Sequence, residues 1–233
     1  MRFQGGKARQ AKAFSDAMLK ASQCRGRYIE PFVGGASVAA YMAPHFKEVL
    51  LSDISLDLIL LYEAVQSGWT PPLTLSKDRY NQLRSESSSA ERGWAGYAGS
   101  YCGKWFGGYG PTCGERDYLL ESYKSMTKKM GALGKAKFEC KKYSDLEVQV
   151  GDIVYCDPSY VDTTAYKDTE FDIAEFWDIA ESWVRDGAIV FVSEFVAPSN
   201  WRSIYTKSRF TVLANKSSSK KDEEHLFTLQ GSP

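Results

Sequence analysis

The sequence predicts an α/β fold in which a mainly parallel, doubly wound sheet is interrupted by a small, mainly helical insertion. Short apolar runs that end at a glycine turn or at an aspartate alternate with helical segments, as they do in doubly wound sheets. The alternation stops at residues 69–72, where two prolines introduce a Ser-rich segment and a stretch dense in glycine and aromatic residues. It resumes before Ile153. We therefore expect residues 1–70 and 136–233 to form one domain, and residues 71–135 to form a second, inserted domain.

The part of the chain before the insertion begins with a helix over residues 7–20, predicted from the spacing of Ala11, Phe14 and Met18. There follow a strand at 28–29, a glycine turn at 33–37, a helix beginning at 38–40, a strand at 49–51 and a helix at 56–65. The first strand runs into Glu30 and the second into Asp53. Because carboxyl ends of parallel strands meet at one edge of a sheet, both acids are expected at that edge.

The second half follows the insertion, which is expected to end in a helix over residues 116–130. A strand at 153–156, a helix at 171–184 and a strand at 188–192 come next. The apolar runs 210–213 and 226–229 are expected to close the sheet as an antiparallel pair, joined by a polar loop over 215–224.

Composition excludes several classes of protein. The 233 residues carry no formal net charge, which is not the profile of a non-specific nucleic-acid coat protein, so a nucleic-acid surface would have to be local. Five irregularly spaced cysteines without a C-x-x-C pair, and only two histidines, make a disulfide framework or a metal site improbable. No apolar run approaches the roughly 20 residues of a membrane span, and the polar N-terminus is unlike a secretory signal, so we expect a cytoplasmic protein.

The first candidate site is the segment Glu30-Pro31-Phe32-Val33-Gly34-Gly35. A strand that feeds a glycine turn presents backbone N–H groups and a helix N-terminus to a ligand, and glycine permits close approach. The segment does not match the G-x-G-x-x-G dinucleotide pattern. A plain strand–helix turn is an equally good interpretation of this segment alone.

The second candidate is Asp53, which follows the next strand. An acid at this place commonly accepts hydrogen bonds from the ribose hydroxyls of an adenosine-containing cofactor. It could instead cap the following helix, but Ser55 and Asp57 are available for that role.

The third candidate is Asp157-Pro158-Ser159-Tyr160, which follows a buried strand. The carboxylate and the neighbouring backbone carbonyl are two acceptors at a fixed separation, which suits an amino group with two N–H donors, and Tyr160 offers a face on which a flat base can stack. A strand-terminating turn is the alternative interpretation.

The order of these segments resembles that of the Dam-type (D12 class) DNA adenine-N6 methyltransferases, particularly the small bacteriophage members. The resemblance runs over nearly the whole chain: Phe3-Gln4-Gly5-Gly6-Lys7, then Tyr28–Ser37, Ser52-Asp53-Ile54, Tyr143-Ser144-Asp145-Leu146, Asp157–Tyr160 and the tail from Asn215 to Leu226. The departure is Ser159, where the family has a second proline. Ser159 leaves the two acceptors, Asp157 and the Pro158 carbonyl, in place.

The resemblance implies a Rossmann-like methyltransferase sheet, S-adenosyl-L-methionine as cofactor, no metal, and residues 71–135 as the target-recognition domain. It implies that the methyl group passes directly to N6 of an adenine flipped out of double-stranded DNA. The catalytic residues would be Asp157, Pro158 and Tyr160. The cofactor-binding residues would be Phe3, Gly6, Lys7, Glu30, Pro31, Phe32, Gly34, Gly35, Ser37, Asp53, Ile54, Asp145 and Asp157.

Local basic clusters suggest the DNA contacts. Lysines gather at 128–142, and lysines and arginines gather again at 202–221. Either group could neutralise phosphates, although a solvated face is an equally good interpretation for any single lysine. The residues expected to bind DNA are Lys104, Arg116, Lys128, Lys216, Lys220 and Lys221.

Two other functions stay open at this point. The Asp-Pro-x-Tyr chemistry would also serve N4 of cytosine or an amino group in RNA. Ser159 is the motive for the second alternative, a catalytically weakened homologue that binds DNA or cofactor without turnover. The sequence gives neither the recognition site nor the oligomeric state, and it does not say whether a partner restriction enzyme exists.

Overall fold

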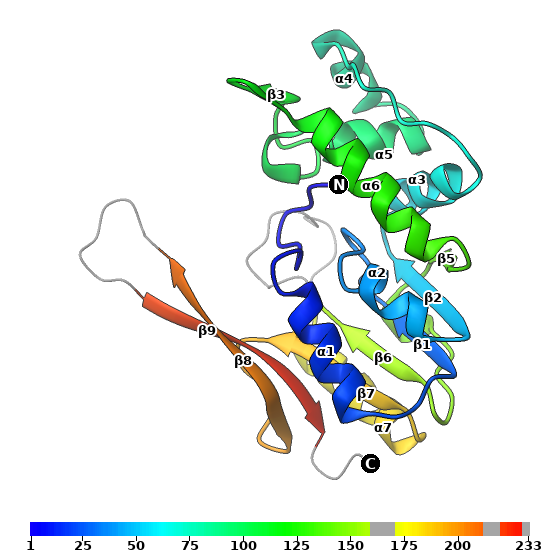
Figure 1. The fold of residues 1–233 in the computed structure, drawn as a ribbon, viewed down its shortest axis with the longest axis vertical. Helices are drawn as coiled ribbons and strands as arrows, with labels where there is room; N and C mark the ends of the chain where they lie inside the picture. Colours follow the sequence, from blue (N-terminus) through cyan, green and yellow to red (C-terminus); the bar gives the residue numbers. More distant parts are fainter. Residues whose placement is uncertain (159–170, 212–219, 230–233) are drawn as a thin grey trace.

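The computed structural model describes residues 1–158, 171–211 and 220–229, which form a mixed seven-stranded sheet with helices on both faces (Figure 1). The strand order is β5-β2-β1-β6-β7-β9-β8. The first five of these strands are parallel, and β9 runs antiparallel to both β7 and β8. The Rossmann-like α/β architecture predicted from the sequence is confirmed.

The strands of this sheet are β1 (Arg27–Glu30), β2 (Glu48–Asp53), β5 (Lys137–Cys140), β6 (Ile153–Cys156), β7 (Ile189–Glu194), β8 (Trp201–Thr211) and β9 (Lys220–Leu229). The α-helices are α1 (Ala11–Ala21), α2 (Ala39–Met42), α3 (Leu56–Gln66), α4 (Lys77–Leu83), α5 (Ala90–Tyr97), α6 (Tyr118–Leu133) and α7 (Ile173–Arg185). Short 3-10 turns η1 (Ala43–His45), η2 (Tyr101–Gly103) and η3 (Tyr143–Asp145) and a small hairpin of β3 (Thr112–Cys113) and β4 (Arg116–Asp117) complete the described elements. None of the described helices is long and apolar enough to cross a membrane.

The sheet reverses its winding between β1 and β6. From β1 the chain moves outward to β2 and then β5, whereas from β6 it moves the other way to β7. Tyr28 of β1 pairs with Ile153 of β6, so the two strands end side by side, at Glu30 and just before Asp157. In such sheets a ligand crevice forms outside the carboxyl ends of the strands at this switch point.

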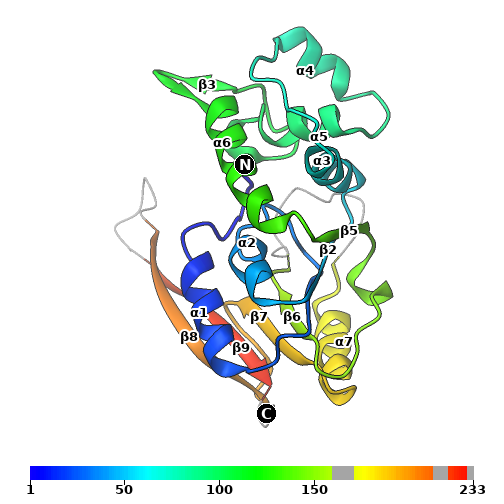
Figure 2. The ribbon, with the colours of Figure 1, turned by 45° about the vertical axis from the view of Figure 1, so that its right-hand side comes forward.

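Side chains alternate between the two faces of the sheet and form two cores. Tyr155 of β6 faces α1, where its ring centroid lies 6.5 Å from that of Phe14. Its neighbour Val154 faces the other way and shares a core with Phe176 of α7. Figure 2 shows α1 and α2 on one side of the sheet and α7 on the other. Both faces are therefore covered, as the continuous apolar runs of β6 and β7 require.

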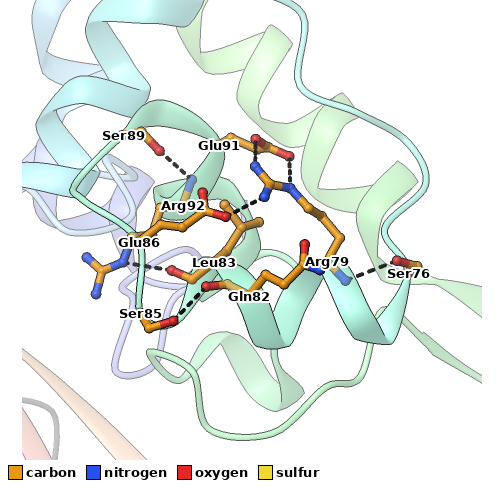
Figure 3. Close-up of polar contacts among 9 residues, drawn as sticks. All are labelled: Ser76, Arg79, Gln82, Leu83, Ser85, Glu86, Ser89, Glu91 and Arg92. Carbon is orange, nitrogen blue, oxygen red and sulfur yellow. Dashed lines mark hydrogen bonds and ion pairs between the residues drawn. The ribbon is translucent and has the colours of Figure 1, made fainter.

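The segment from 71 to 135 folds around α4, α5 and α6. In Figure 3, Arg79 of α4 forms ion pairs with Glu86 and with Glu91 of α5. A further ion pair, between Arg92 and Asp57, ties α5 to the first turn of α3. The helix α6 begins at its cap Asp117, whose side chain accepts the Leu120 N–H at 2.9 Å, and its later turns pack on α2 and η1. The segment thus contacts the rest of the fold through α5 and through α6.

Several predicted boundaries are wrong. The closing hairpin is much longer than expected: β8 starts at Trp201, and β9 already includes residues 220–224, which we predicted as loop. These strands carry charged residues throughout, which hides them from a search for apolar runs. The edge strand β5 was not predicted, because in Lys137–Cys140 only Phe138 is buried. The helix expected at 38–40 has four residues only.

Candidate active site

A cavity of about 590 Å³ opens at the switch point, over the carboxyl ends of β1, β2 and β6. Its walls come from the N-terminal segment, the turn after β1, the ends of β2 and β6, and the loop after α5. Its lining residues include Phe3, Lys7, Glu30, Phe32, Gly34, Gly35, Ser37, Asp53, Ile54, Tyr97, Trp105, Tyr143, Asp157, Pro158 and Phe171. The volume lies within the range of small-molecule and cofactor sites.

The turn after β1 is built around Phe3. A Cβ on Gly34, where φ is +41°, would lie 3.0 Å from Cε1 of Phe3, and a Cβ on Gly35 would lie 3.0 Å from its Cβ. The Phe3 ring in turn stacks on Tyr97 at a centroid distance of 4.9 Å. We expected these glycines to admit a ligand, but the group that approaches them in the structure is a side chain of the N-terminal segment.

Asp53 fastens this turn to β2. Its Oδ2 accepts the Gly34 N–H at 3.1 Å, and its Oδ1 accepts the Ser55 N–H at 3.0 Å. Only 6% of the residue is exposed, yet it lines the cavity. The two interpretations of Asp53 are therefore compatible, because one carboxylate orders the start of α3 and also faces the cavity.

Asp157 is held from one side. Its Oδ1 is 2.7 Å from Nζ of Lys7, and it accepts the Ser193 hydroxyl at 3.0 Å. The Ser193 hydroxyl also lies 2.9 Å from that of Tyr155. For the part of the chain that is described, no partner of Asp157 is recorded at Oδ2. Burial raises the pKa of Asp157, and attraction to Lys7 opposes that rise.

Lys7 is the cation on which this network is centred. Its side chain is 3% exposed, and Nζ lies 3.0 Å from Oε1 of Glu224 in β9 as well as close to Asp157. Gln10 donates to the other Glu224 oxygen at 3.0 Å. The helix α1 begins only at Ala11, so Lys7 sits in the preceding turn and reaches inward. The bland interpretation, a solvated lysine at a helix start, is wrong.

Two more carboxyl groups lie near Asp157. Burial raises the pKa of Glu30 to about 8, although the Tyr28 hydroxyl, 2.7 Å away, favours the charged form. Burial likewise raises the pKa of Glu194, at the end of β7, to about 7. Strongly perturbed carboxyl groups grouped at one crevice are typical of functional sites.

Most predicted cofactor residues meet in this cavity, but two do not. Pro31 is buried in the turn and is not among the lining residues, and Asp145 is exposed at the end of η3 and is not among them either. In the same segment Tyr143, at the start of η3, lines the cavity, whereas the predicted acid does not. Ser159 and Tyr160 lie outside the described residues.

The predicted DNA-binding residues are scattered. Lys128 is exposed on α6, Lys104 is half-buried, and Arg116 is exposed but holds both oxygens of Glu121 at 2.8 and 2.9 Å. Lys216 and the side chains of Lys220 and Lys221 lie outside what the structure describes. Lys129 and Lys142, which belong to the same basic cluster, are engaged with Ser37 and Glu175 respectively.

Ser193, Tyr97 and Trp105 complete the site but were not predicted from the sequence. Ser193 lies near the end of the apolar strand β7 and belongs to no motif. The one signal for Tyr97 and Trp105 is that they lie in the stretch dense in glycine and aromatic residues. Among the described residues, no group of three or more histidine, cysteine, aspartate or glutamate side chains is arranged to hold a metal ion.

Residues 3–92, which include the whole Phe3–Asp53 side of this cavity, match the family model of the D12 class N6 adenine-specific DNA methyltransferase. The matched residues make up about two-fifths of the chain, which resembles this family over its N-terminal part. The enzymes of this family are DNA methyltransferases specific for N6 of adenine, as the resemblance in the sequence implies.

Individual relatives are more distant. A DNA adenine methylase of Salmonella typhi is 27% identical over 87% of this chain and 86% of its own length. The type II methyltransferase M.CviBI of Paramecium bursaria Chlorella virus NC1A is 35% identical over 68 residues, which are 29% of this chain and a quarter (25%) of the relative. Among solved structures, a putative methyltransferase of Escherichia coli matches over 96% of this chain and 87% of its own length, with 9% identity and a TM-score of 0.42.

Proposed function

We propose that this protein belongs to the D12 class and methylates N6 of an adenine turned out of double-stranded DNA, with Asp157 and the Pro158 carbonyl as the acceptors for the amino group. The observation that carries the proposal is the one-sided hold on Asp157. Lys7 and Ser193 both contact Oδ1, which leaves Oδ2 to accept an N–H bond from a base in the cavity.

The acceptors act by positioning and electrostatics. When an N–H of the amino group bonds to Oδ2 and the other to the Pro158 carbonyl, the nitrogen lone pair is directed out of the base plane. The Lys7 cation, 2.7 Å from Oδ1, favours the charged form of Asp157 and so opposes the rise in its pKa that burial causes. Tyr160 is the proposed stacking face for the base, since every base offers a π-face.

The rest of the cavity suits the cofactor. S-adenosylmethionine, when bound, supplies an electrophilic methyl group. Asp53, at the end of β2, is placed to accept hydrogen bonds from ribose hydroxyls, and Phe32, Ile54 and Phe171 offer apolar surface for a flat ring. We assign Phe3 to the support of the glycine turn, which it packs against.

The segment 71–135 is our candidate for the target-recognition region. It supplies Tyr97, Gly103 and Trp105 to the cavity wall, and the hairpin of β3 and β4 projects from the same part of the molecule (Figure 1). DNA of a bacterium, or of a phage within its host, would be the substrate, in the cytoplasm.

The test is incubation of the purified protein with methyl-labelled S-adenosylmethionine and DNA from a strain that lacks adenine methylation. Nucleoside analysis should find the label in N6-methyladenine, and Asp157→Ala should abolish it while cofactor binding persists. Label in N4-methylcytosine, label in RNA only, or cofactor binding with no labelled product would each overturn the proposal.

A further inference from the structure

Lys129 of α6 turns inward, onto the turn that lines the cavity. Its Nζ donates a hydrogen bond to the Gly35 carbonyl and another, at 3.0 Å, to the Ser37 hydroxyl. The preceding residue, Lys128, is exposed. Two adjacent lysines therefore differ completely in their surroundings, although the sequence gives no reason to separate them.

The Lys129 amine lies where burial disfavours a cation. Burial lowers the pKa of Lys129 to about 8, and the nearby Glu30 favours the charged form. An ammonium group removed from water destabilises the protein unless its donors are satisfied. Here two of the three donors bond to a carbonyl and a hydroxyl of the turn, so the position of the turn and that of the lysine depend on each other.

The carbonyl that Lys129 holds belongs to a strained part of the turn. The next residue, Ala36, has φ of +50°, in the left-handed region that a residue with a Cβ seldom adopts. Such a conformation persists only where surrounding contacts fix it. The Lys129 bond to the Gly35 carbonyl fixes the peptide that enters Ala36.

The helix that carries Lys129 spans two regions of the molecule. At its first residue, Tyr118, it follows the β3–β4 hairpin of the proposed target-recognition segment, and its later turns pack on α2 and η1. Eleven residues separate Tyr118 from Lys129, which corresponds to about 16 Å along a helix. One rigid element thus joins the hairpin to the cofactor turn, as the course of α6 in Figures 1 and 2 shows.

We infer that Lys129 is a positioning residue for the cofactor site: from the inserted segment it fixes the Gly35–Ala36 peptide and Ser37, so that the cofactor cavity is complete only while α6 is docked on the turn. Lys129 is not itself among the cavity-lining residues, so it acts through Gly35 and Ser37, which are. The inference rests on the proposed function, because it assigns the turn to S-adenosylmethionine.

The experiment compares Lys129→Met with Lys128→Met, two substitutions one position apart on the same helix. Methionine keeps most of the length of the side chain and removes the donors. For Lys129→Met we expect the Kd and the KM for S-adenosylmethionine to rise about tenfold, the loss of one charged hydrogen bond. The KM for DNA and the melting temperature of the cofactor-free protein should stay near their wild-type values. Lys128→Met should leave the cofactor constants unchanged.

Two further variants separate positioning from mere packing. Lys129→Arg keeps a charged donor and should recover much of the cofactor affinity. Combining Lys129→Met with Ala36→Gly, which relieves the left-handed strain, should lose less affinity than Lys129→Met alone. If Lys129→Met does not fold, Lys129→Gln, which keeps a donor without the charge, gives the same comparison.

The failure of this inference differs from that of the proposed function. A wild-type protein that binds S-adenosylmethionine and methylates DNA, with a Lys129→Met variant whose cofactor Kd changes less than twofold, overturns the inference alone. So would equal losses in the Lys128→Met and Lys129→Met variants. A wild-type protein that binds cofactor but labels no DNA overturns the proposed function instead, and the two cofactor constants would still decide the role of Lys129.

Discussion

Two buried lysines come from distant parts of the chain, Lys7 to the wall of the cavity and Lys129 to the glycine turn behind it, and they are stabilised in different ways. Lys7, from the N-terminal segment, lies between two carboxylates, with Nζ at 2.7 Å from Asp157 and 3.0 Å from Glu224. Lys129, from α6, donates to the neutral Gly35 carbonyl and Ser37 hydroxyl, and burial lowers its pKa to about 8. Lys7 therefore serves as a fixed positive charge, whereas Lys129 holds the backbone of the turn by hydrogen bonds.

The difference shows that the neighbours, and not the residue type, decide what a buried cation contributes. A lysine between two buried carboxylates cannot be removed without leaving uncompensated charge, whereas a lysine on neutral acceptors leaves only unmade hydrogen bonds. Lys7 should therefore affect both the reaction and the stability of the fold. Lys129 should affect mainly the cofactor site.

The largest effect is expected for Lys7→Met. The substitution removes the Lys7 cation from Asp157 and Glu224, so the pKa of Asp157 rises further, which favours the protonated form, a weaker acceptor. We expect kcat to fall by about a hundredfold or more, and the free energy of unfolding to fall by about 3–5 kcal/mol. Initial rates and urea unfolding measure the two. Lys12→Met, which removes an exposed ion pair with Asp16, is the control and should change neither. A kcat within threefold of wild type would show that Lys7 is only structural.

A smaller effect is expected for Ser193→Ala. Ser193 donates to Asp157 Oδ1, on the side away from the proposed acceptor atom, so its loss lets the carboxylate rotate without removing its charge. We expect kcat to fall about tenfold, as for one hydrogen bond to a charged group. The KM for S-adenosylmethionine should not change. Ser199→Ala, at an exposed position six residues further on, is the matched control. A rise in the cofactor KM with an unchanged kcat would contradict this assignment.

The contrast between the lysines also marks what the sequence could predict. The strands β1, β2 and β6, and the acids that follow them, were predictable because apolar runs, a glycine turn and aspartates follow the periods of a doubly wound sheet. Lys7, directly after Gly5 and Gly6, and Asp157, directly after β6, were predictable in the same way. The positions of these residues follow from the order of neighbouring segments along the chain, which the sequence shows directly.

The missed features depend on contacts between distant segments. Ser193 is 36 residues from Asp157, and Lys129 is 92 residues from Ser37. No pattern near either residue distinguishes it from a surface serine or a solvated lysine. The full length of β8 and β9 was missed for a different reason. These strands pair mainly with each other at the edge of the sheet, where charged residues are tolerated, so most of their length contains no continuous apolar run by which a strand can be predicted.

The smallest expected effect concerns Glu30, the carboxyl group whose charge favours the charged form of Lys129. It is seen in the pH dependence of stability. Burial raises the pKa of Glu30 to about 8, well above its unfolded value near 4.5, so between these values the folded state binds more protons than the unfolded state. Stability contributed by the protonated group is then full below about pH 4.5 and is lost as the pH rises toward 8. The free energy of unfolding should fall by about 1–3 kcal/mol between pH 5 and pH 8.

Glu30→Gln, which imitates the protonated form, should flatten this dependence when urea unfolding is measured at pH 5.5, 6.5 and 7.5. A residual slope of the same sign should remain, because burial also raises the pKa of Glu194, to about 7. Glu48→Gln, at an exposed position at the start of β2, should keep the wild-type slope. If Glu30→Gln kept it too, Glu30 would be ionised in the folded protein at neutral pH. Lys129 would then be half of an ion pair, as Lys7 is, and the contrast between the two lysines would disappear.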